Sequence, residues 1–279
     1  MSNKKVISYY EETLADYRIF WYSQKDFAMH YGFADDSTKS HSGRLLRENM
    51  FLAEIAKIKK SDVVLDAGCG VGGSSIWIAK NYGSKVIGIS NCPSHIKKAM
   101  GYAHKSGVNE LAEFYKMDYQ ATKFKDCSFN VVWAIESFCH SPNKPELLKE
   151  MFRILKPGGR IIAADGFQKN NSKTKEEQKT FDEFVSGFAV YNITFWDEFR
   201  IILSDAGFKK IRRWDKTISI LPSSKRIYCL ALFTYPFWKI LSILNLISKT
   251  RMDNITACLA QFESLKSGLW MYGVYYAEK

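Results

Sequence analysis

The order of apolar and polar residues divides the chain into a helical beginning, a regularly alternating middle and a less regular end. At the beginning, apolar residues at helical spacing predict helices over residues 8–22 and 44–57. In the middle, short apolar runs typical of buried strands alternate with longer runs at helical spacing. The expected strands are 63–66, 85–89, 112–117, 129–135 and 160–164, and the expected helices are 74–82, 93–106 and 144–155.

Strands that alternate with helices predict an α/β protein with a Rossmann-like, doubly wound and mostly parallel sheet. Past residue 165 the pattern loosens. The polar, lysine-rich residues 170–179 predict a mobile loop. Further on we expect a helix at 194–205, a strand at 208–219, a helical insertion, and an aromatic strand at 268–277 that closes a seven-stranded sheet.

The sequence therefore predicts three parts. Residues 1–57 form an aromatic helical arm, which is either a lid or plain packing. Residues 58–166 form a core that binds a cofactor. Residues 167–279 complete the sheet and carry the helical insertion, at about 222–266, as a cap.

Composition supports this picture and limits the function. With 279 residues and 46% hydrophobic residues, the chain suits one elaborated domain or a core with a cap. Its six cysteines show no paired spacing, and no cleavable apolar leader is visible, so we expect a reducing, cytoplasmic setting. The histidines and cysteines form no ligand cluster, so we expect no metal.

The net charge of +11 is concentrated near the end of the chain. From Lys209 to Arg251 there are ten Lys or Arg residues, and Asp215 is the only acid. Because the mostly apolar residues 227–247 lie in this region, an anionic membrane surface or an amphiphilic substrate fits better than nucleic acid. If the substrate were instead a polar metabolite, the apolar insertion would be only a homodimer face. A solvated rim around a packed cap is the alternative. Polar residues and a proline interrupt 227–247, which argues against a transmembrane helix.

The glycine turn after the first expected strand carries the first chemical signal. Asp66 is followed by Gly68, Gly70, Gly72 and Gly73 and then by a helix. Glycines let a ligand approach the backbone, and the amides at the start of the helix face it. The spacing departs from the dinucleotide fingerprint, and the Gly-Lys-Ser ending of a phosphate loop is absent. A nucleoside with a cationic amino-acid tail fits the Asp66 carboxylate better than a phosphate, although a purely structural turn remains open.

Three motifs between residues 64 and 159 resemble those of class I S-adenosylmethionine-dependent methyltransferases. The resemblance rests on Val-Leu-Asp-Ala-Gly-Cys-Gly-Val-Gly-Gly-Ser-Ser at 64–75, Phe-Lys-Asp-Cys-Ser-Phe at 124–129 and Lys-Pro-Gly-Gly at 156–159. A narrower resemblance is to the sterol side-chain and tocopherol methyltransferases. It rests on residues 70–75, on Val-Ile-Gly-Ile-Ser at 86–90, on Ile-Glu-Ser-Phe-Cys-His at 135–140 and on His-Tyr-Gly-Phe at 30–33.

The resemblance implies that S-adenosyl-L-methionine is the cofactor and indicates which residues bind it. The second strand ends in Ser90-Asn91, where many class I enzymes carry an acid for the ribose hydroxyls. His95 either helps there or is an ordinary surface histidine. Asp118 is expected to meet the adenine amino group. The expected cofactor residues are Asp66, Ala67, Gly68, Gly70, Ser90, Asn91, His95, Met117, Asp118, Tyr119 and Ile135.

Glu136 and His140, just past the fourth expected strand, are the candidate catalytic residues, together with Tyr31. An oxygen or nitrogen acceptor needs a base, and an alkene acceptor passes through a carbocation that aromatic faces stabilise before a base removes a proton. The alternative is that Glu136 binds cofactor backbone and His140 caps the next helix. The expected substrate-pocket residues are Tyr10, Trp21, Tyr22 and His30.

Together these features predict a methyltransferase that acts on a hydrophobic small molecule, chiefly by C-methylation of an isoprenoid, sterol-like or prenylquinone-type lipid. The acceptor is expected between the aromatic arm and the helical insertion. Alternatives are an O- or N-methyltransferase of a polar metabolite and a non-catalytic lipid- or membrane-binding protein on the same fold. An RNA-modifying enzyme lacks support, because no added RNA-binding segment is present.

Overall fold

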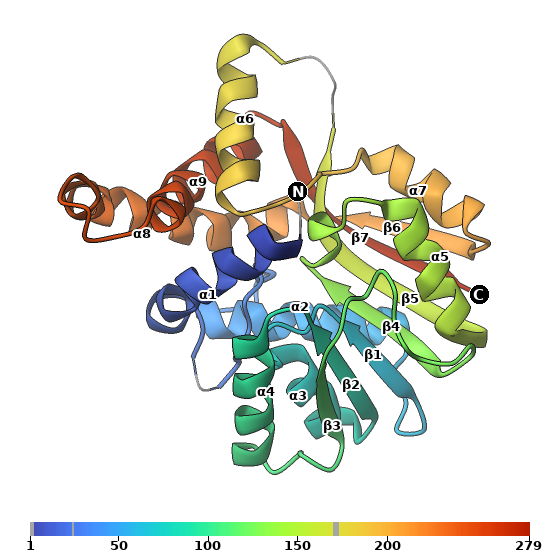
Figure 1. The fold of residues 1–279 in the computed structure, drawn as a ribbon. Helices are drawn as coiled ribbons and strands as arrows, with labels where there is room; N and C mark the ends of the chain where they lie inside the picture. Colours follow the sequence, from blue (N-terminus) through green and yellow to red (C-terminus); the bar gives the residue numbers. More distant parts are fainter. Residues whose placement is uncertain (1–2, 24, 170–172) are drawn as a thin grey trace.

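A twisted seven-stranded sheet forms the centre of the computed structural model, which describes residues 3–23, 25–169 and 173–279 (Figure 1). The strand order is β3-β2-β1-β4-β5-β7-β6. Only β7 runs antiparallel to its neighbours, so the predicted seven-stranded, mostly parallel sheet is confirmed. The strands are β1 (Val63–Ala67), β2 (Lys85–Ser90), β3 (Ala112–Lys116), β4 (Phe129–Ile135), β5 (Leu155–Gln168), β6 (Lys209–Asp215) and β7 (Trp270–Glu278).

Hydrophobic cores cover both faces of the sheet, because successive side chains of a strand point to opposite sides. Val64 belongs to one core and Leu65 to the other. The first core receives apolar residues from α2 (His41–Ala56), α3 (Gly73–Tyr82) and α4 (Pro93–Lys105). The second receives them from α5 (Lys144–Ile154) and α7 (Trp196–Asp205). This two-sided burial explains the nearly continuous apolar runs of the central strands.

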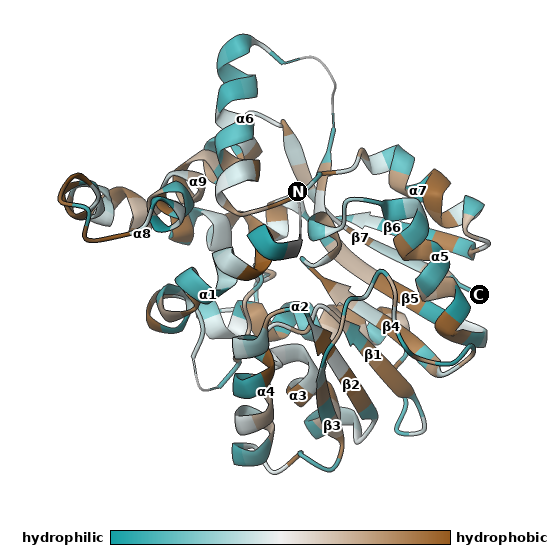
Figure 2. Cartoon of the chain, viewed as in Figure 1, coloured by the Kyte–Doolittle hydropathy of each residue, from teal (hydrophilic) through white to brown (hydrophobic). Residues whose placement is uncertain are grey.

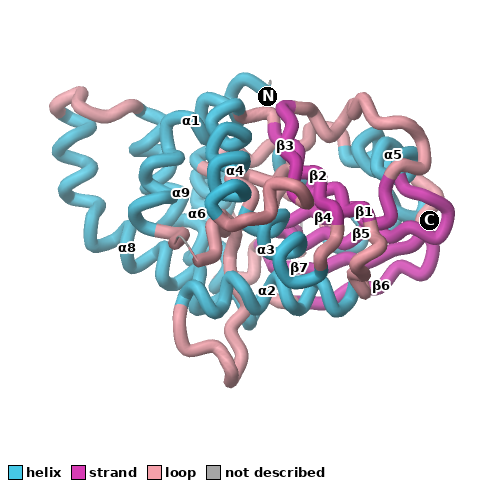
Figure 3. Tube along the Cα trace, turned by 90° about the horizontal axis from the view of Figure 1, so that it is seen from below, coloured by secondary structure: helices cyan, strands magenta, loops and turns pink. Residues whose placement is uncertain are grey.

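Four further helices gather beside the sheet (Figures 1 and 3). They are α1 (Asn3–Phe20), α6 (Lys175–Gly187), α8 (Thr217–Ile243) and α9 (Lys249–Lys266). The Arg251 guanidinium on α9 donates to both Asp16 carboxylate oxygens on α1, at 2.5 and 3.1 Å. The Tyr9 hydroxyl donates to Asn254 Oδ1 at 3.1 Å. The N-terminal arm therefore packs on the C-terminal insertion, although the two are far apart in sequence.

Two local predictions are wrong. Within 170–179, residues 170–172 lie outside the described residues, but Lys175 begins α6 where a loop was expected. Thr174 and Glu177 form a capping box that stabilises this helix start. Within 208–219, β6 ends at Asp215 and α8 begins at Thr217. The β-branched residues there resemble a strand, but packing of α8 on α9 and the sheet overrides that preference.

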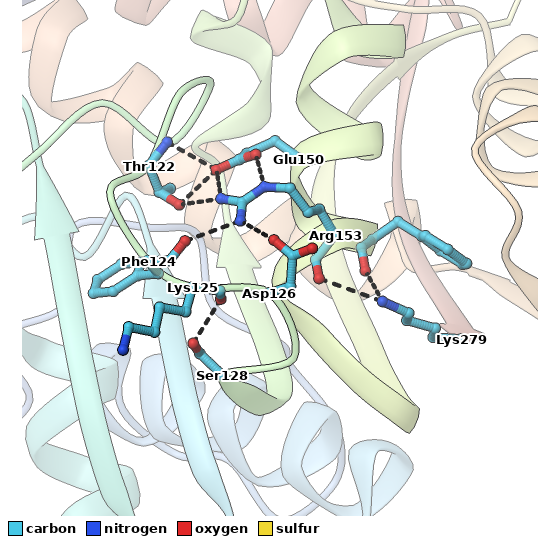
Figure 4. A network of polar contacts seen from close by, with 9 residues as sticks. Thr122, Phe124, Lys125, Asp126, Ser128, Glu150, Arg153 and Lys279 are labelled. Carbon is cyan, nitrogen blue, oxygen red and sulfur yellow. Dashed lines mark hydrogen bonds and ion pairs between the residues drawn. The ribbon is translucent and has the colours of Figure 1, made fainter.

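Arg153 on α5 fixes the long loop between β3 and β4 (Figure 4). Its guanidinium donates to Glu150 Oε1 at 2.7 Å, to Asp126 Oδ1 at 2.6 Å and to the Phe124 carbonyl at 2.9 Å. Glu150 Oε1 also accepts from the Thr122 amide at 2.8 Å. This network holds the loop that follows Asp118, one of the expected cofactor residues.

Candidate active site

A cavity opens at the carboxyl ends of β1, β2 and β4, where ligands bind in sheets of this kind. Its lining combines polar side chains with the backbone of the glycine turn, which suits a nucleoside with an amino-acid tail. Segments of α1 and of the chain before α2 cover it. Of the expected cofactor residues, nine line it: Asp66, Gly68, Gly70, Ser90, Asn91, His95, Asp118, Tyr119 and Ile135.

The glycine turn shapes one wall of this cofactor cavity. Gly68 has a φ of +97°, and a Cβ there would lie 2.3 Å from the Ser137 Cβ. Gly70 has a φ of +51°. Residues other than glycine rarely adopt this left-handed backbone conformation. The turn therefore requires glycine for its backbone path, and at Gly68 also for the close approach of the segment after β4.

Asp66 places a carboxyl group in the cavity. The residue is only 3% exposed, and its Oδ2 accepts from the Ser75 hydroxyl at 2.5 Å. Burial raises the pKa of the Asp66 carboxyl to about 6. No ion pair to Asp66 is found in the part of the chain that the structure describes. A cationic ligand would compensate this buried group, whereas a phosphate would be repelled.

His95 is buried, so the alternative of a surface histidine is wrong. Its Nε2 atom has no hydrogen-bond partner among the described residues, and the side chain lines the cavity. Burial lowers the pKa of His95 to about 4, which keeps the ring neutral at physiological pH. A neutral imidazole can pair with a hydroxyl or amino group of a ligand. His95 therefore supports the site beside Ser90 and Asn91.

Two expected cofactor residues do not line the described cavities. Ala67 and Met117 instead pack in the second hydrophobic core. The pleat of β1 turns the Ala67 side chain away from the crevice, and Met117 directly follows the end of β3. Ala67 contributes its backbone, since its carbonyl accepts from the Ser137 hydroxyl at 2.6 Å. Met117 likewise donates its amide to the Ser90 carbonyl at 3.1 Å.

His140 and Tyr10 form a hydrogen-bonded pair at the edge of the cavity. His140 Nδ1 lies 3.0 Å from the Ala189 carbonyl, which can only accept, so Nδ1 carries the proton. Nε2 then accepts from the Tyr10 hydroxyl at 3.0 Å. Burial lowers the pKa of His140 to about 4. The helix-capping alternative for His140 is wrong, because the Asn143 side chain caps α5.

Glu136 lies where β4 leaves the sheet, at the junction of this cavity and a second one. Its φ of +47° is a strained value for a residue other than glycine. Glu136 Oε1 accepts from the Tyr31 amide at 2.7 Å and contacts the Tyr272 hydroxyl at 2.9 Å. Burial raises the pKa of Glu136 to about 8, and the neighbouring Glu48 adds to this.

Sequence reasoning missed Glu48 and Tyr272. The Tyr272 hydroxyl contacts Glu48 Oε1 at 2.8 Å as well as Glu136, and because it has one proton, one of these carboxyl groups must be protonated if both contacts are hydrogen bonds. Glu48 Oε2 lies 3.0 Å from His30 Nδ1. Burial opposes a charged His30, but the Glu48 carboxylate outweighs it and raises the pKa of His30 to about 9. His30 Nε2 has no partner among the described residues, and the ring lines both cavities.

The second cavity, called here the acceptor cavity, lies between the arm, the cap and the sheet. It shares Tyr10, Met29, His30, Glu136 and His140 with the cofactor cavity. Its remaining wall is mainly aromatic and aliphatic: Tyr17, Trp21, Tyr31, Phe184, Phe188, Val190, Ile193, Ile227, Trp270 and Tyr272, beside Cys139, Asp165 and Gly166.

The structure does not bring Tyr22 to either cavity. Its side chain lies in the hydrophobic core. Burial raises the pKa of the Tyr22 hydroxyl, and the neighbouring Tyr102 raises it further. Tyr31 lines the acceptor cavity but points its hydroxyl at Gln261 Oε1, at 2.8 Å. Tyr10, Trp21 and His30 do line the acceptor cavity.

This fold and site define a class of proteins: Rossmann-like α/β proteins that bind a nucleoside with a cationic tail. Residues 65–163 match the family model described as a methyltransferase domain. The chain is 30% identical over 245 residues to cycloartenol-C-24-methyltransferase of Arabidopsis thaliana, and the match covers 82% of this chain and 68% of that enzyme. The chain therefore belongs to the S-adenosylmethionine-dependent methyltransferases, in the group of the sterol and tocopherol enzymes.

Two other relatives support this membership. The tocopherol O-methyltransferase of Arabidopsis thaliana, a chloroplastic enzyme, is 29% identical, with 99% of this chain and 82% of that enzyme covered. The sterol 24-C-methyltransferase of Saccharomyces cerevisiae is 32% identical over 74% of this chain, but the match spans only 53% of the yeast enzyme.

Solved structures share the fold. A geranyl diphosphate methyltransferase in complex with GPP and sinefungin has a TM-score of 0.76 at 17% identity, with 99% of this chain and 98% of that chain covered. The cyclase SpnF has a TM-score of 0.81 at 18% identity, with 100% and 97% covered. Because a cyclase is similar to the same degree, the fold alone does not define the reaction.

The cofactor of the family, S-adenosyl-L-methionine, fits the residues of the first cavity. Its sulfonium and ammonium groups match the buried Asp66 carboxyl group. Its hydroxyl and amino groups match Asn91, Asp118 and His95, whose Nε2 has no hydrogen-bond partner among the described residues. Across the described residues, we find no group of three or more His, Cys, Asp or Glu that could hold a metal ion.

Proposed function

We propose that this protein methylates carbon on an isoprenoid, sterol-like or prenylquinone-type lipid. The observation that carries the proposal is the acceptor cavity, which is mainly apolar and aromatic and meets the cofactor cavity at Glu136. A polar metabolite would leave most of this wall without partners. The sterol and cycloartenol relatives are named as C-24-methyltransferases, which supports a carbon acceptor.

In the proposed reaction, S-adenosylmethionine would supply the methyl group: its bond between sulfur and the methyl carbon would break as the bond to the acceptor forms, and S-adenosylhomocysteine would be released. A new bond to an alkene carbon leaves the acceptor as a carbocation, and the faces of Trp21, Tyr17 and Trp270 would stabilise that charge. Glu136 is the proposed proton acceptor: its carboxylate takes the proton that restores a neutral alkene. Its raised pKa makes it a stronger base than an ordinary carboxylate, and a nearby cation favours its ionised form.

The proposed roles of the other cavity residues are to position the acceptor. His140 is neutral and its Nε2 is occupied by Tyr10, so with a pKa near 4 it is a poor base for an oxygen or nitrogen acceptor. His30, held by Glu48, offers a free Nε2–H to a polar group of the acceptor. Tyr31 fixes Glu136 through its backbone amide.

The arm has a proposed role as a lid. Val6, Ile7 and Tyr10 on α1 line the cofactor cavity, and Glu11 Oε1 accepts from the Ser94 amide at 3.1 Å at the start of α4. Movement of α1 would open the cavity for exchange of the cofactor.

The proposal places the protein in the cytoplasm, supported by six cysteines without paired spacing. None of the described helices is long and apolar enough to cross a membrane. The exposed apolar residues of the cap are proposed as a surface for peripheral membrane contact or for a homodimer.

Donor binding and lipid analysis test the proposal. We expect S-adenosylhomocysteine to raise the melting temperature of the purified protein, and lipid extracts of expressing cells to contain a prenyl or sterol lipid with added methyl mass. Glu136→Gln cells should lack this product. Methylated polar amines without a methylated lipid would favour the polar-metabolite alternative, and the absence of donor binding would favour a lipid-binding protein.

A further inference from the structure

A third cavity, called here the groove, runs from the acceptor cavity towards the outer end of the cap. It lies between α1, α8 and α9 and is lined mainly by apolar side chains, with Asp16, Thr234 and Asn254 as polar members of the wall. Four residues belong to the walls of both the groove and the acceptor cavity: Tyr17, Trp21, Phe188 and Ile227. The groove therefore adjoins the acceptor cavity and offers a mainly apolar route to it from the side of α8 and α9.

The outer half of α8, beside the groove, exposes large apolar side chains to solvent. Phe233 is 88% exposed and Phe237 is 58% exposed. With Ile240 and Leu244 they follow a spacing of four, three and four residues, which places them on one side of the helix. Figure 2 shows this end of α8 projecting from the body as a hydrophobic segment. The exposed apolar residues of α8, of the turn after it and of the neighbouring end of α1 include Ile19, Phe20, Leu232, Phe233, Phe237, Ile240, Ile243, Leu244 and Leu246.

Within residues 217–252, which carry this apolar face, every charged residue is basic. Residues 217–252 contain five Lys or Arg residues and no acid. Lys225, Arg226, Lys239 and Lys249 are exposed, and the remaining cation, Arg251, pairs with Asp16. Basic side chains beside an apolar helix face attract anionic lipid headgroups while the apolar residues enter the acyl boundary.

A second copy of the chain fits this face less well. In a two-fold dimer the same patch meets itself, so the exposed cations of one copy would face those of the other without any acid from residues 217–252 to compensate. An anionic bilayer satisfies both the apolar residues and the cations.

We propose that the outer half of α8 docks on an anionic membrane surface and that the groove admits the lipid acceptor directly from the bilayer. The docking half of this inference is independent of the proposed function, whereas the delivery half rests on it. The aromatic residues Phe20 and Trp238 line the groove where α1 faces α8, and lipid would pass them before reaching Tyr17 and Trp21.

Flotation with lipid vesicles tests docking without any activity measurement. We expect the purified protein to float with phosphatidylcholine/phosphatidylglycerol vesicles, less with pure phosphatidylcholine, and less at high salt. The affinity of the variant F233E/F237E for the vesicles should be lower by about tenfold or more for each phenylalanine ring that no longer enters the apolar phase. The matched control M100E/I201E adds the same charge at residues that are 56% and 50% exposed on α4 and α7, and should bind as the wild type does.

The melting temperature and the response to S-adenosylhomocysteine should be unchanged in both variants, since neither Phe233 nor Phe237 lines a described cavity. Equal flotation of F233E/F237E and wild type would overturn docking through α8. If the wild type is a dimer and F233E/F237E is a monomer, and neither binds vesicles, the face belongs to a second copy of the chain instead.

Delivery is tested by measuring methylation of the same acceptor in vesicles and in detergent micelles. With acceptor in anionic vesicles, F233E/F237E should methylate at least about tenfold more slowly than the control, and with the same acceptor in detergent micelles the two should be equal. Equal rates in vesicles would overturn delivery through the groove. No methylation by any variant in either form would contradict the proposed function while leaving the flotation result intact.

Discussion

Glu136 combines three features that rarely occur together in a purely structural residue. Its backbone is in the left-handed region, its carboxyl pKa is raised to about 8, and its side chain lies where the cofactor and acceptor cavities meet. Strained, buried acids of this kind concentrate at functional sites. In this protein the strain is held by hydrogen bonds from the Tyr31 amide and by contact with Tyr272.

Replacement of Glu136 by Gln should remove the proton acceptor while leaving an oxygen for the Tyr31 amide. We expect kcat to fall about 10²–10⁴-fold, the range typical of a lost general base. In the wild type, the rate should rise with pH through about 8 and level off only above that value, because only the ionised carboxylate accepts a proton. Turnover across this pH range and calorimetric titration with S-adenosylhomocysteine check both points. Loss of cofactor binding in the variant would assign Glu136 to the cofactor instead.

The buried pair of His30 and Glu48 should make stability depend on pH. The pKa of His30 is raised from 6.5 to about 9 in the folded protein, so its stabilising effect is complete below about pH 6.5 and is lost as pH rises through 9. We expect Glu48→Gln to lower the free energy of unfolding at pH 6 by an amount on the order of 2–3 kcal/mol and to flatten the decline between pH 6.5 and 9.

Urea unfolding at several pH values measures this difference. Glu54→Gln is the matched control, since Glu54 is on the same helix but its side chain is 62% exposed. Equal slopes for the wild type and Glu48→Gln would mean that the pair does not carry the pH dependence.

At the level of elements, the arm and the glycine turn form one unit. Gly73 begins α3, and a Cβ there would lie 2.5 Å from the Phe27 carbonyl oxygen in the segment before α2. That segment continues into Ala28, Met29 and His30, which line the cofactor cavity. The arm is thus fitted directly against the helix start that the cofactor faces.

Gly73→Ala should force the segment around Phe27 away from α3. We expect a loss of about 1–3 kcal/mol in stability, as for overpacked sites, together with weaker binding of S-adenosylmethionine. Gly101→Ala on α4 is the control, because a Cβ at Gly101 would meet no described atom within 4 Å. It should stabilise the protein by about 0.5–1 kcal/mol, since alanine favours a helix interior. Chemical denaturation measures the stability of both variants, and titration with S-adenosylmethionine measures their affinity for it. Weak binding by both variants would mean that the contact between Gly73 and the arm is not the cause.

At the level of the whole molecule, the sequence pattern predicts the sheet well and the cap less well. The strands of the core are buried on both faces, so apolar runs and glycine turns mark them clearly. In α6, the signal that could have been found is the capping box of Thr174 and Glu177, which a lysine-rich composition concealed. The start of α8 depends on packing against distant elements, and no local signal gives that.

The candidate site likewise contains residues that local sequence motifs mark and residues that only distant contacts define. Asp66 and Glu136 lie beside sequence motifs, whereas Glu48 acquires its role through His30 and through Tyr272, which is 224 residues away. One signal for Glu48 was present: it shares a helix face with the core residues Leu45 and Leu52. A charged residue in a core position calls for a buried partner, but the sequence cannot say which one.

The central claim is that the cofactor cavity and the acceptor cavity together transfer a methyl group to carbon of an isoprenoid lipid. The most direct measurement is incubation of the purified protein with ¹³C-methyl-labelled S-adenosylmethionine and a set of sterol, prenylquinone and tocopherol-type acceptors, followed by mass spectrometry and NMR of the products. We predict a product in which the labelled methyl group is bonded to carbon, formed by the wild type and not by Glu136→Gln. Label bonded only to oxygen or nitrogen, or an equal yield from Glu136→Gln, would contradict the account.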